Sequence, residues 1–301
     1  MKFLVTGGAG FIGSHLTRLL VQSGHSVIVV DNLHRGKIEN LHDIIDKIQF
    51  HKIDILDSTQ LQEVAKQTDG IFHQAALTSV IESFTQEKKY YDVNVKGTEN
   101  IFRIAKEHQI KVVYASSSSV YGNPHKIPIS EDFERKPINP YGMTKLDDEN
   151  LAEKFSRIGT QIIGLRYFNV YGSAQNLDYA GVISKFYDNI AKNKPPVIFG
   201  DGRQVRDFIS VKDVAKANLM AMQSSLGFGF INVGTGIATS ILDLAKIMIS
   251  LSGKTLEPIH EQLPEGDVHS SQANTIFARQ VISWQSKTPL ESGLREFFFS
   301  S

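Results

Sequence analysis

The sequence predicts an α/β fold with a doubly wound parallel sheet and a smaller C-terminal α/β lobe. Three observations support this prediction. Short runs of apolar, β-favouring residues recur along the chain, segments with apolar residues at helical spacing separate them, and a glycine-rich turn follows the first run. Strands that alternate with helices in this way form a parallel sheet with helices on both faces. The chain of 301 residues is long enough for one large domain or two coupled domains.

The apolar runs and helical patterns predict the secondary structure of most of the chain. Candidate strands are residues 3–5, 26–30, 49–53, 70–76, 111–115, 162–165 and 229–233. One candidate helix begins near residue 11, and others span 61–68, 91–107, 141–155 and 211–222. A short helix or turn is expected at 41–48. Residues 180–192, 239–252 and 279–298 are expected to supply the helices of the lobe. We therefore predict a sheet domain, residues 1–166 with 211–237, and a lobe, residues 167–210 with 238–301.

Three glycines, Gly7, Gly10 and Gly13, connect the first strand to the first helix. Glycine adopts positive φ angles and lets another backbone come close, which residues with a Cβ do less easily. A helix that begins at such a turn directs free N–H groups and the positive end of its dipole at whatever lies above the turn. We therefore expect a diphosphate to bind here, against the three glycines, Phe11 and Ile12.

Asp31 follows the second strand, 18 residues after Gly13. An acidic residue about 20 residues after this kind of turn accepts hydrogen bonds from the adenosine ribose of a dinucleotide. A carboxylate there also repels a 2′-phosphate, so the sequence predicts NAD rather than NADP, although Arg35 is a nearby cation that could weaken the preference. Strand, glycine turn, helix, strand and terminal acid together predict a Rossmann domain.

Further residues at the carboxyl edge of the predicted sheet are candidates for cofactor contacts. Asp54 follows the third strand, where the adenine would lie, although a helix cap or loop acid explains it equally well. Ala75 and Ala76 follow the fourth strand, and their small side chains let the backbone approach the diphosphate or the nicotinamide ribose. Asn94, near the start of the helix 91–107, could fix either the backbone or the cofactor.

A second group of polar residues points to catalysis. Residues 116–119 are four serines at the carboxyl end of the fifth strand, the edge at which open α/β sheets bind ligands. Asn139 and Pro140 predict a helix start, which places Tyr141 and Lys145 on one face, four residues apart. An unperturbed tyrosine, with a pKa of about 10, is a poor base at neutral pH. A nearby ammonium and a positive nicotinamide ring stabilise the phenolate form, so this pair is a candidate acid/base.

The glycine turn, the serines and the tyrosine–lysine pair together resemble the extended short-chain dehydrogenase/reductase family, and in particular its UDP-hexose 4-epimerase branch. Matching segments occur at 6–15, 31–33, 54–55, 73–76, 94–97, 116–122, 141–145, 166–172, 205–209 and 266–267. The resemblance implies C4 epimerisation of a UDP-hexose through a 4-keto intermediate, with NAD that stays bound through turnover. It also implies that Asn32 and Ile55 contact the cofactor.

The resemblance assigns roles to the catalytic residues. Tyr141 is expected to remove the proton of the C4 hydroxyl, and Lys145 to activate Tyr141 and hold the nicotinamide ribose. Ser117 is expected to hydrogen-bond the same hydroxyl oxygen. Ser118 is the alternative if the alignment within the serine run shifts by one residue.

On the substrate side, the resemblance implies that Asn169 and Arg206 contact the diphosphate of the sugar nucleotide and that Asp267 belongs to the same site. Pro264 departs from the branch, because an arginine is expected there as a second clamp on the nucleotide. Ser271 aligns with the residue beside the C2 substituent of the hexose, where a bulky side chain restricts the pocket to glucose and galactose. The small Ser271 therefore predicts that N-acetylhexosamines are also accepted.

Other activities of such proteins are alternatives. Dehydratases and decarboxylases carry an acidic residue beside the catalytic Ser or Thr, where this chain has Ser118 and Ser119, so both are disfavoured. UDP-glucuronate 4-epimerases share the serine run, whereas Asn169 and residues 173–175 favour a neutral hexose. A dinucleotide-sensing regulatory protein usually lacks the tyrosine–lysine pair, which is intact here.

Composition argues against several other classes. The 32 Lys and Arg residues balance 32 Asp and Glu residues, so no net charge favours nucleic acid or an anionic membrane. The chain has no cysteine, and its ten histidines show no metal-ligand spacing, so no metal is expected. No apolar run approaches the ~20 residues that span a bilayer, and a cytoplasmic enzyme is expected. Relatives pair the helices that match 91–107 and 141–155 with their copies, which implies a homodimer.

Overall fold

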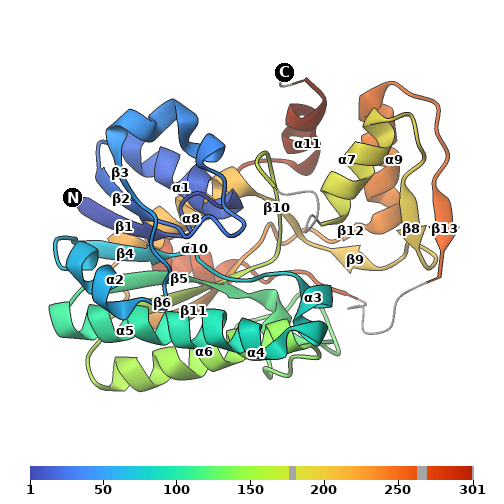
Figure 1. Ribbon diagram of the computed structural model, residues 1–301. Helices are drawn as coiled ribbons and strands as arrows, with labels where there is room; N and C mark the ends of the chain where they lie inside the picture. The colour runs from blue at the N-terminus through green and yellow to red at the C-terminus, as the bar shows by residue number, and fades with distance from the viewer. Residues whose placement is uncertain (176–180, 263–269, 300–301) are drawn as a thin grey trace.

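The computed structural model describes residues 1–175, 181–262 and 270–299. Its centre is a sheet of seven strands in the order β11-β6-β5-β4-β1-β2-β3, and every neighbouring pair is parallel (Figure 1). The strands are β1 (Lys2–Thr6), β2 (Ser26–Val30), β3 (Ile48–His51), β4 (Gly70–His73), β5 (Lys111–Ser117), β6 (Ile162–Tyr167) and β11 (Phe228–Val233). The doubly wound parallel sheet predicted from the sequence is confirmed.

The alternation of side chains along each strand explains why helices cover both faces. In β1, Phe3 and Val5 belong to one apolar cluster, and Leu4 belongs to another on the opposite face. The first cluster includes side chains of α1 (Phe11–Gln22), the 3₁₀-helical η1 (Ile38–Lys47), α8 (Val211–Gln223) and α10 (Ile276–Ile282). The second includes side chains of α2 (Ser58–Ala65), α5 (Gly97–His108) and α6 (Pro140–Arg157), so two helical layers enclose the sheet (Figure 1).

The segment before α5 contains more helix than the sequence predicts. α4 (Glu87–Tyr90), the π-helical η2 (Tyr91–Lys96) and α5 follow one another directly, so the predicted helix 91–107 begins earlier. α3 (Val80–Thr85) was not predicted; the side chain of Ser79 caps it by accepting a hydrogen bond from the N–H of Glu82. A short 3₁₀ helix, η3 (Ser118–Tyr121), follows β5.

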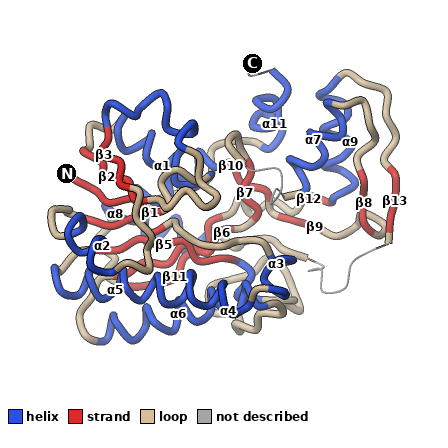
Figure 2. Tube along the Cα trace, in the orientation of Figure 1, coloured by secondary structure: helices blue, strands red, loops and turns tan. Residues whose placement is uncertain are grey.

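The small lobe stands beside the sheet (Figure 2). It contains α7 (Val182–Ala191), α9 (Ile241–Ser252) and α11 (Leu290–Phe299), whose side chains, such as Phe186, Met248 and Leu294, form a third apolar cluster. Three short strand pairs complete the region: β7 (Asn169–Tyr171) with β10 (Phe208–Ser210), β9 (Val205–Arg206) with β12 (Thr239–Ser240), and β8 (Val197–Phe199) with β13 (Ile259–Glu261).

The helical segment 279–298 differs from its prediction. The structure has two helices, α10 and α11, and α10 packs on β11 and α8 against the sheet rather than in the lobe. Ala278 and Ile282 are buried in the cluster on that face, and Ser283 ends α10 in the left-handed conformation, with φ of 52°. Assigning this whole segment to the lobe was therefore wrong, because the apolar residues of its first helix are buried against the sheet.

Candidate active site

A cavity of about 650 Å³ lies at the carboxyl edge of the sheet, where the strand order reverses between β1 and β4. Crevices at such a reversal bind ligands in open α/β sheets, and small-molecule sites typically enclose ~300–1,000 Å³. Most of the predicted site residues line this cavity: Gly7, Gly10, Phe11, Ile12, Gly13, Asp31, Asn32, Asp54, Ile55, Ala75, Ala76, Ser117, Tyr141, Lys145 and Asn169.

Two of the three positions can hold only glycine, because a side chain there would clash with neighbouring backbone atoms. Gly7 has a φ of +67°, and a Cβ there would lie 2.6 Å from the backbone nitrogen of Ala75. A Cβ on Gly13 would lie 2.0 Å from the carbonyl oxygen of Gly7, so the first turn of α1 packs directly against the glycine turn. Gly10 is the N-cap of α1 and has no side chain to cap it. An uncapped helix start at the cavity wall fits a bound diphosphate.

Asp31 directly follows β2, and hydrogen bonds fix the position of its carboxylate. Its oxygens accept hydrogen bonds from the N–H groups of Ala9 (3.0 Å) and Leu33 (2.8 Å). Burial raises the pKa of Asp31, although both hydrogen bonds oppose that effect. Arg35, the cation that could weaken a preference for NAD, forms an ion pair with Glu82 of α3. Its charge is therefore already balanced within the protein.

Asn32 and Asp54 lie together at the same end of the cavity. The side-chain amide of Asn32 donates a hydrogen bond to Asp54 (2.9 Å), which also accepts one from the N–H of Leu56 (2.9 Å). Asp54 thus shapes its own loop while it lines the cavity. Both interpretations from the sequence, a loop acid and an adenine contact, are compatible with this geometry.

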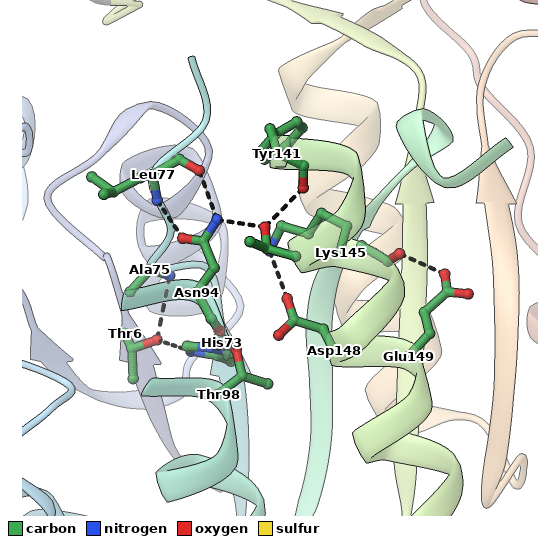
Figure 3. Close-up of polar contacts among 12 residues, drawn as sticks. Thr6, His73, Ala75, Leu77, Asn94, Thr98, Tyr141, Lys145, Asp148 and Glu149 are labelled. Carbon is green, nitrogen blue, oxygen red and sulfur yellow. Dashed lines mark hydrogen bonds and ion pairs between the residues drawn. The ribbon is translucent and has the colours of Figure 1, made fainter. Parts of the chain in front are cut away.

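Helix α6 presents Tyr141 and Lys145 to the cavity. The side chain of Asn139 caps this helix by accepting a hydrogen bond from the N–H of Gly142 (2.8 Å). Lys145 is only 3% exposed, and its ammonium nitrogen lies 3.1 Å from Oδ2 of Asp148 (Figure 3). Burial lowers the pKa of Lys145, but the electrostatic effects of Asp148 and Tyr141 outweigh burial and raise it. A buried ammonium is therefore maintained on the face of α6 that carries Tyr141.

The four serines have different surroundings. Ser117, the last residue of β5, lines the cavity, and its Oγ accepts a hydrogen bond from the N–H of Ser119 (3.1 Å). Ser116 is buried and donates a hydrogen bond to Glu149 (2.7 Å). Ser118 is not among the described residues that line the cavity. This arrangement favours Ser117 over Ser118 as the serine that faces a substrate.

Asn94 lies behind the cavity wall rather than in the lining. Its carboxamide accepts a hydrogen bond from the N–H of Leu77 (2.8 Å) and donates one to the carbonyl oxygen of Leu77 (3.0 Å; Figure 3). It also donates a hydrogen bond to Oγ1 of Thr144 (3.0 Å). It therefore joins the loop after β4 to α6. Of the two roles that the sequence left open, the geometry supports the fixing of the backbone.

Arg206 and Ser271, the predicted substrate residues of the lobe, lie near one another but outside the described cavity lining. The N–H of Ser271 donates to the carbonyl oxygen of Val205, the neighbour of Arg206 (3.1 Å). Asn169, which does line the cavity, donates its N–H to the carbonyl oxygen of Asp207 (3.0 Å). The strand that carries Arg206 therefore runs toward the cavity edge. Asp267 and Pro264 lie outside the described residues.

Two acidic residues near the cavity, Glu82 and Asp148, were not predicted from the sequence. Glu82 binds Arg35 across 47 positions of sequence, and no local pattern predicts such a pair. The position of Asp148 could have been predicted from the sequence, because an acidic residue three positions after a lysine on a helix lies beside that lysine. Within the described ranges, no helix is long and apolar enough to cross a membrane, and no group of three or more His, Asp and Glu side chains could hold a metal ion.

The strand order, the glycine turn against α1 and the cavity at the strand reversal define a dinucleotide-binding protein of the Rossmann class. Residues 3–234 match the family model described as "NAD dependent epimerase/dehydratase family". The chain belongs to this family, and the resemblance seen in the sequence is confirmed.

Named relatives extend this result to the whole chain. A "Putative UDP-glucose 4-epimerase" of Methanocaldococcus jannaschii is 39% identical over 297 residues, which cover 97% of this chain and 95% of the relative. The solved structure of a UDP-N-acetylglucosamine 4-epimerase from Methanobrevibacter ruminantium M1, in complex with UDP-N-acetylmuramic acid, is 35% identical with a TM-score of 0.95 and coverages of 99% and 96%. A UDP-glucuronic acid 4-epimerase from Bacillus cereus, in complex with UDP-glucuronic acid and NAD, is 30% identical with a TM-score of 0.91 and coverages of 99% and 98%.

Proposed function

We propose that this protein is an NAD-dependent 4-epimerase that interconverts UDP-glucose and UDP-galactose and also accepts their N-acetylated counterparts. The observation that carries the proposal is the combination, in one cavity, of the glycine turn, Asp31, Ser117 and the pair Tyr141–Lys145. Membership of an epimerase family and similarity over the whole chain to UDP-sugar 4-epimerases support it.

The residues present suit NAD. The glycine turn and the uncapped first turn of α1 would hold the diphosphate, Asp31 the adenosine ribose, and Lys145 the nicotinamide ribose. The pairing of Arg35 with Glu82 leaves Asp31 to disfavour a 2′-phosphate. When bound, NAD supplies the acceptor and then the donor of the C4 hydride.

Tyr141 acts as the acid/base. Its phenolate takes the proton of the C4 hydroxyl as the carbonyl forms, and its phenol returns a proton to the C4 oxygen as the carbonyl is reduced, so no net proton is consumed. Lys145 stabilises the phenolate, and Ser117 hydrogen-bonds the C4 oxygen. Between the two half-reactions the 4-keto sugar turns about its diphosphate linkage, which inverts the configuration at C4.

The lobe supplies the substrate contacts. Asn169 and Arg206 would hold the diphosphate of the sugar nucleotide, a task that suits the planar guanidinium of arginine. Ser271 would leave space beside C2 of the hexose, enough for an N-acetyl group. Asp267 belongs to the same proposed site.

UDP-glucuronate is the second candidate substrate, because the serine run matches glucuronate epimerases and the Bacillus cereus enzyme shares the fold at 30% identity. Proton NMR of the purified enzyme with each of three sugar nucleotides, UDP-glucose, UDP-N-acetylglucosamine and UDP-glucuronate, separates the candidates. Conversion of the first two to their C4 epimers without added NAD is expected. Conversion of UDP-glucuronate alone would transfer the assignment to the second candidate.

Tyr141→Phe is the matched control for this experiment, because it removes only the phenolic oxygen. It is expected to abolish nearly all turnover of every sugar while NAD binding is retained. If none of the sugars reacts in wild type even after NAD is added, the proposed epimerase activity fails.

We also propose a homodimer in which α5 and α6 pair with their copies. Tyr91, at the start of η2, which leads into α5, and Met143, in the first turn of α6, have large side chains that are about half exposed and that a partner would cover. Light scattering is expected to give twice the 33.5 kDa mass of the chain. A monomer at micromolar concentration would contradict the proposal.

A further inference from the structure

We propose that Asp148 is a positioning residue, which holds the ammonium of Lys145 and competes with the phenolate of Tyr141 for the positive charge of that ammonium. Asp148 thereby sets the pH range in which Tyr141 can accept a proton. The inference rests on the proposed function, in which Tyr141 is the acid/base, and adds a residue to it. Asp148 has no place among the cofactor and substrate contacts predicted from the sequence.

Asp148 is a buried acid that forms an ion pair with Lys145. It lies one helical turn after Lys145 on α6, is completely buried, and places Oδ2 3.1 Å from the ammonium nitrogen (Figure 3). Its other oxygen, Oδ1, has no hydrogen-bond partner in the part of the chain that the structure describes. A buried carboxylate depends on its counter-ion, so the position and charge of Lys145 are tied to Asp148.

Three polar side chains beside Asp148 form a chain of hydrogen bonds that carries no charge. Thr6 Oγ1 lies 2.6 Å from Nδ1 of His73, and Nε2 of His73 lies 2.9 Å from Oγ1 of Thr98 (Figure 3). The hydroxyl of Thr98 donates to the carbonyl oxygen of Asn94 and also hydrogen-bonds Asp148, whose pKa it lowers, so His73 must donate to Thr98 and accept from Thr6. Burial lowers the pKa of His73 to about 3, so this ring is neutral and gives Asp148 no positive charge.

The remaining titratable neighbours also leave Lys145 as the cation that Asp148 faces. Tyr114 of β5 is fully buried, and burial raises its pKa well above the usual value, so it is an uncharged phenol. Asp147 is the acid next to Asp148 in sequence and adds a negative charge. Arg166 is held by Glu149 through two hydrogen bonds of 2.8 Å.

The protonation of Asp148 changes at mildly acidic pH. Burial raises its pKa to about 6, against the opposing effect of Lys145. Above that pH the carboxylate neutralises the ammonium, and a phenolate on Tyr141 would be a second anion that shares one cation. The ammonium of Lys145 interacts electrostatically with both groups, so the charge of one affects the ionisation of the other. Ionised Asp148 therefore opposes the phenolate, and removal of its charge favours it.

The test is Asp148→Asn, which keeps an oxygen for Lys145 and removes the charge. The phenolate absorbance near neutral and alkaline pH is measured with and without NAD and without sugar, and the Tyr141→Phe trace is subtracted. The midpoint of the Tyr141-dependent signal is expected to move ~1 pH unit toward acid. The acid limb of the kcat profile is expected to move in the same direction. Asp147→Asn is the matched control and is expected to leave the midpoint in place.

An unchanged midpoint in Asp148→Asn would overturn the proposal, as would a kcat that falls equally at every pH. If Asp148→Asn does not fold, Asp148→Ser also removes the charge while it retains an oxygen, and it must give the same acid shift. Because the absorbance titration needs no sugar, it tests the effect of Asp148 on Tyr141 even if the wild-type protein converts none of the sugar nucleotides. Failure of the epimerase assignment would therefore be seen separately, by NMR.

Discussion

Replacing Gly7 by alanine tests whether the turn before α1 requires glycine for its backbone angle alone or also for close contact with the loop after β4. Gly24, at the end of α1, is the matched control: its φ is +79°, close to the +67° of Gly7, but a Cβ there would meet nothing within 4 Å. Alanine in the left-handed region costs ~1–2 kcal/mol at either position. At Gly7 the added Cβ would also lie 2.6 Å and 2.7 Å from backbone atoms of Ala75, so the cavity wall must move.

Gly24→Ala is expected to lose ~1–2 kcal/mol of unfolding free energy in urea titrations, and Gly7→Ala is expected to lose more because its Cβ also overlaps backbone atoms of Ala75. Gly7→Ala is expected to lose, in addition, at least about tenfold in NAD affinity, which corresponds to ~1.4 kcal/mol. Calorimetric titration with NAD measures this, after any bound cofactor has been removed. If Gly7→Ala binds NAD as tightly as Gly24→Ala does, the turn does not form the diphosphate site and the reasoning is refuted.

Three further predictions concern other parts of the molecule. Glu149→Gln leaves the buried guanidinium of Arg166 without its counter-ion and is expected to cost ~3–5 kcal/mol of stability in urea titrations; Glu153→Gln, which removes a partly exposed ion pair, is expected to cost less than ~1 kcal/mol. Ser271→Tyr is expected to abolish turnover of UDP-N-acetylglucosamine but not of UDP-glucose in the NMR assay, and equal loss of both would contradict the role of Ser271. The pKa of His73 is about 3 in the folded protein and 6.5 in the unfolded chain, so between these pH values only the unfolded chain binds the proton. The free energy of unfolding should therefore fall by up to ~1.4 kcal/mol per pH unit as the pH drops below 6.5. The fall should be smaller in His73→Gln.

The sheet was predictable because its signals are local. The central strands are short apolar runs that are buried on both faces, and the switch to helical spacing after Gly13 marks the start of α1 within a few residues. The face shared by Tyr141 and Lys145 follows from helix geometry once Asn139 and Pro140 fix the helix start. Such features need no knowledge of distant contacts.

The features that the sequence did not predict depend on tertiary packing. The break between α10 and α11 follows from which surface buries Ala278 and Ile282. The role of Asn94 depends on Leu77, which reaches it only when the loop after β4 packs on η2. The low pKa of His73 likewise arises from burial in the folded chain, which a list of residue types does not report.

The carboxylate of Asp31 has a consequence for any redesign of the nucleotide preference. It ties Ala9 of the glycine turn to Leu33 of the next loop, and a Cβ on Gly36 would lie 2.7 Å from its oxygens. Exchange for an apolar residue would therefore loosen both loops that must frame an added phosphate. A route to NADP use should retain a side-chain oxygen, as Asp31→Asn or Asp31→Ser does, and should release Arg35 with Glu82→Gln so that its guanidinium can meet the phosphate.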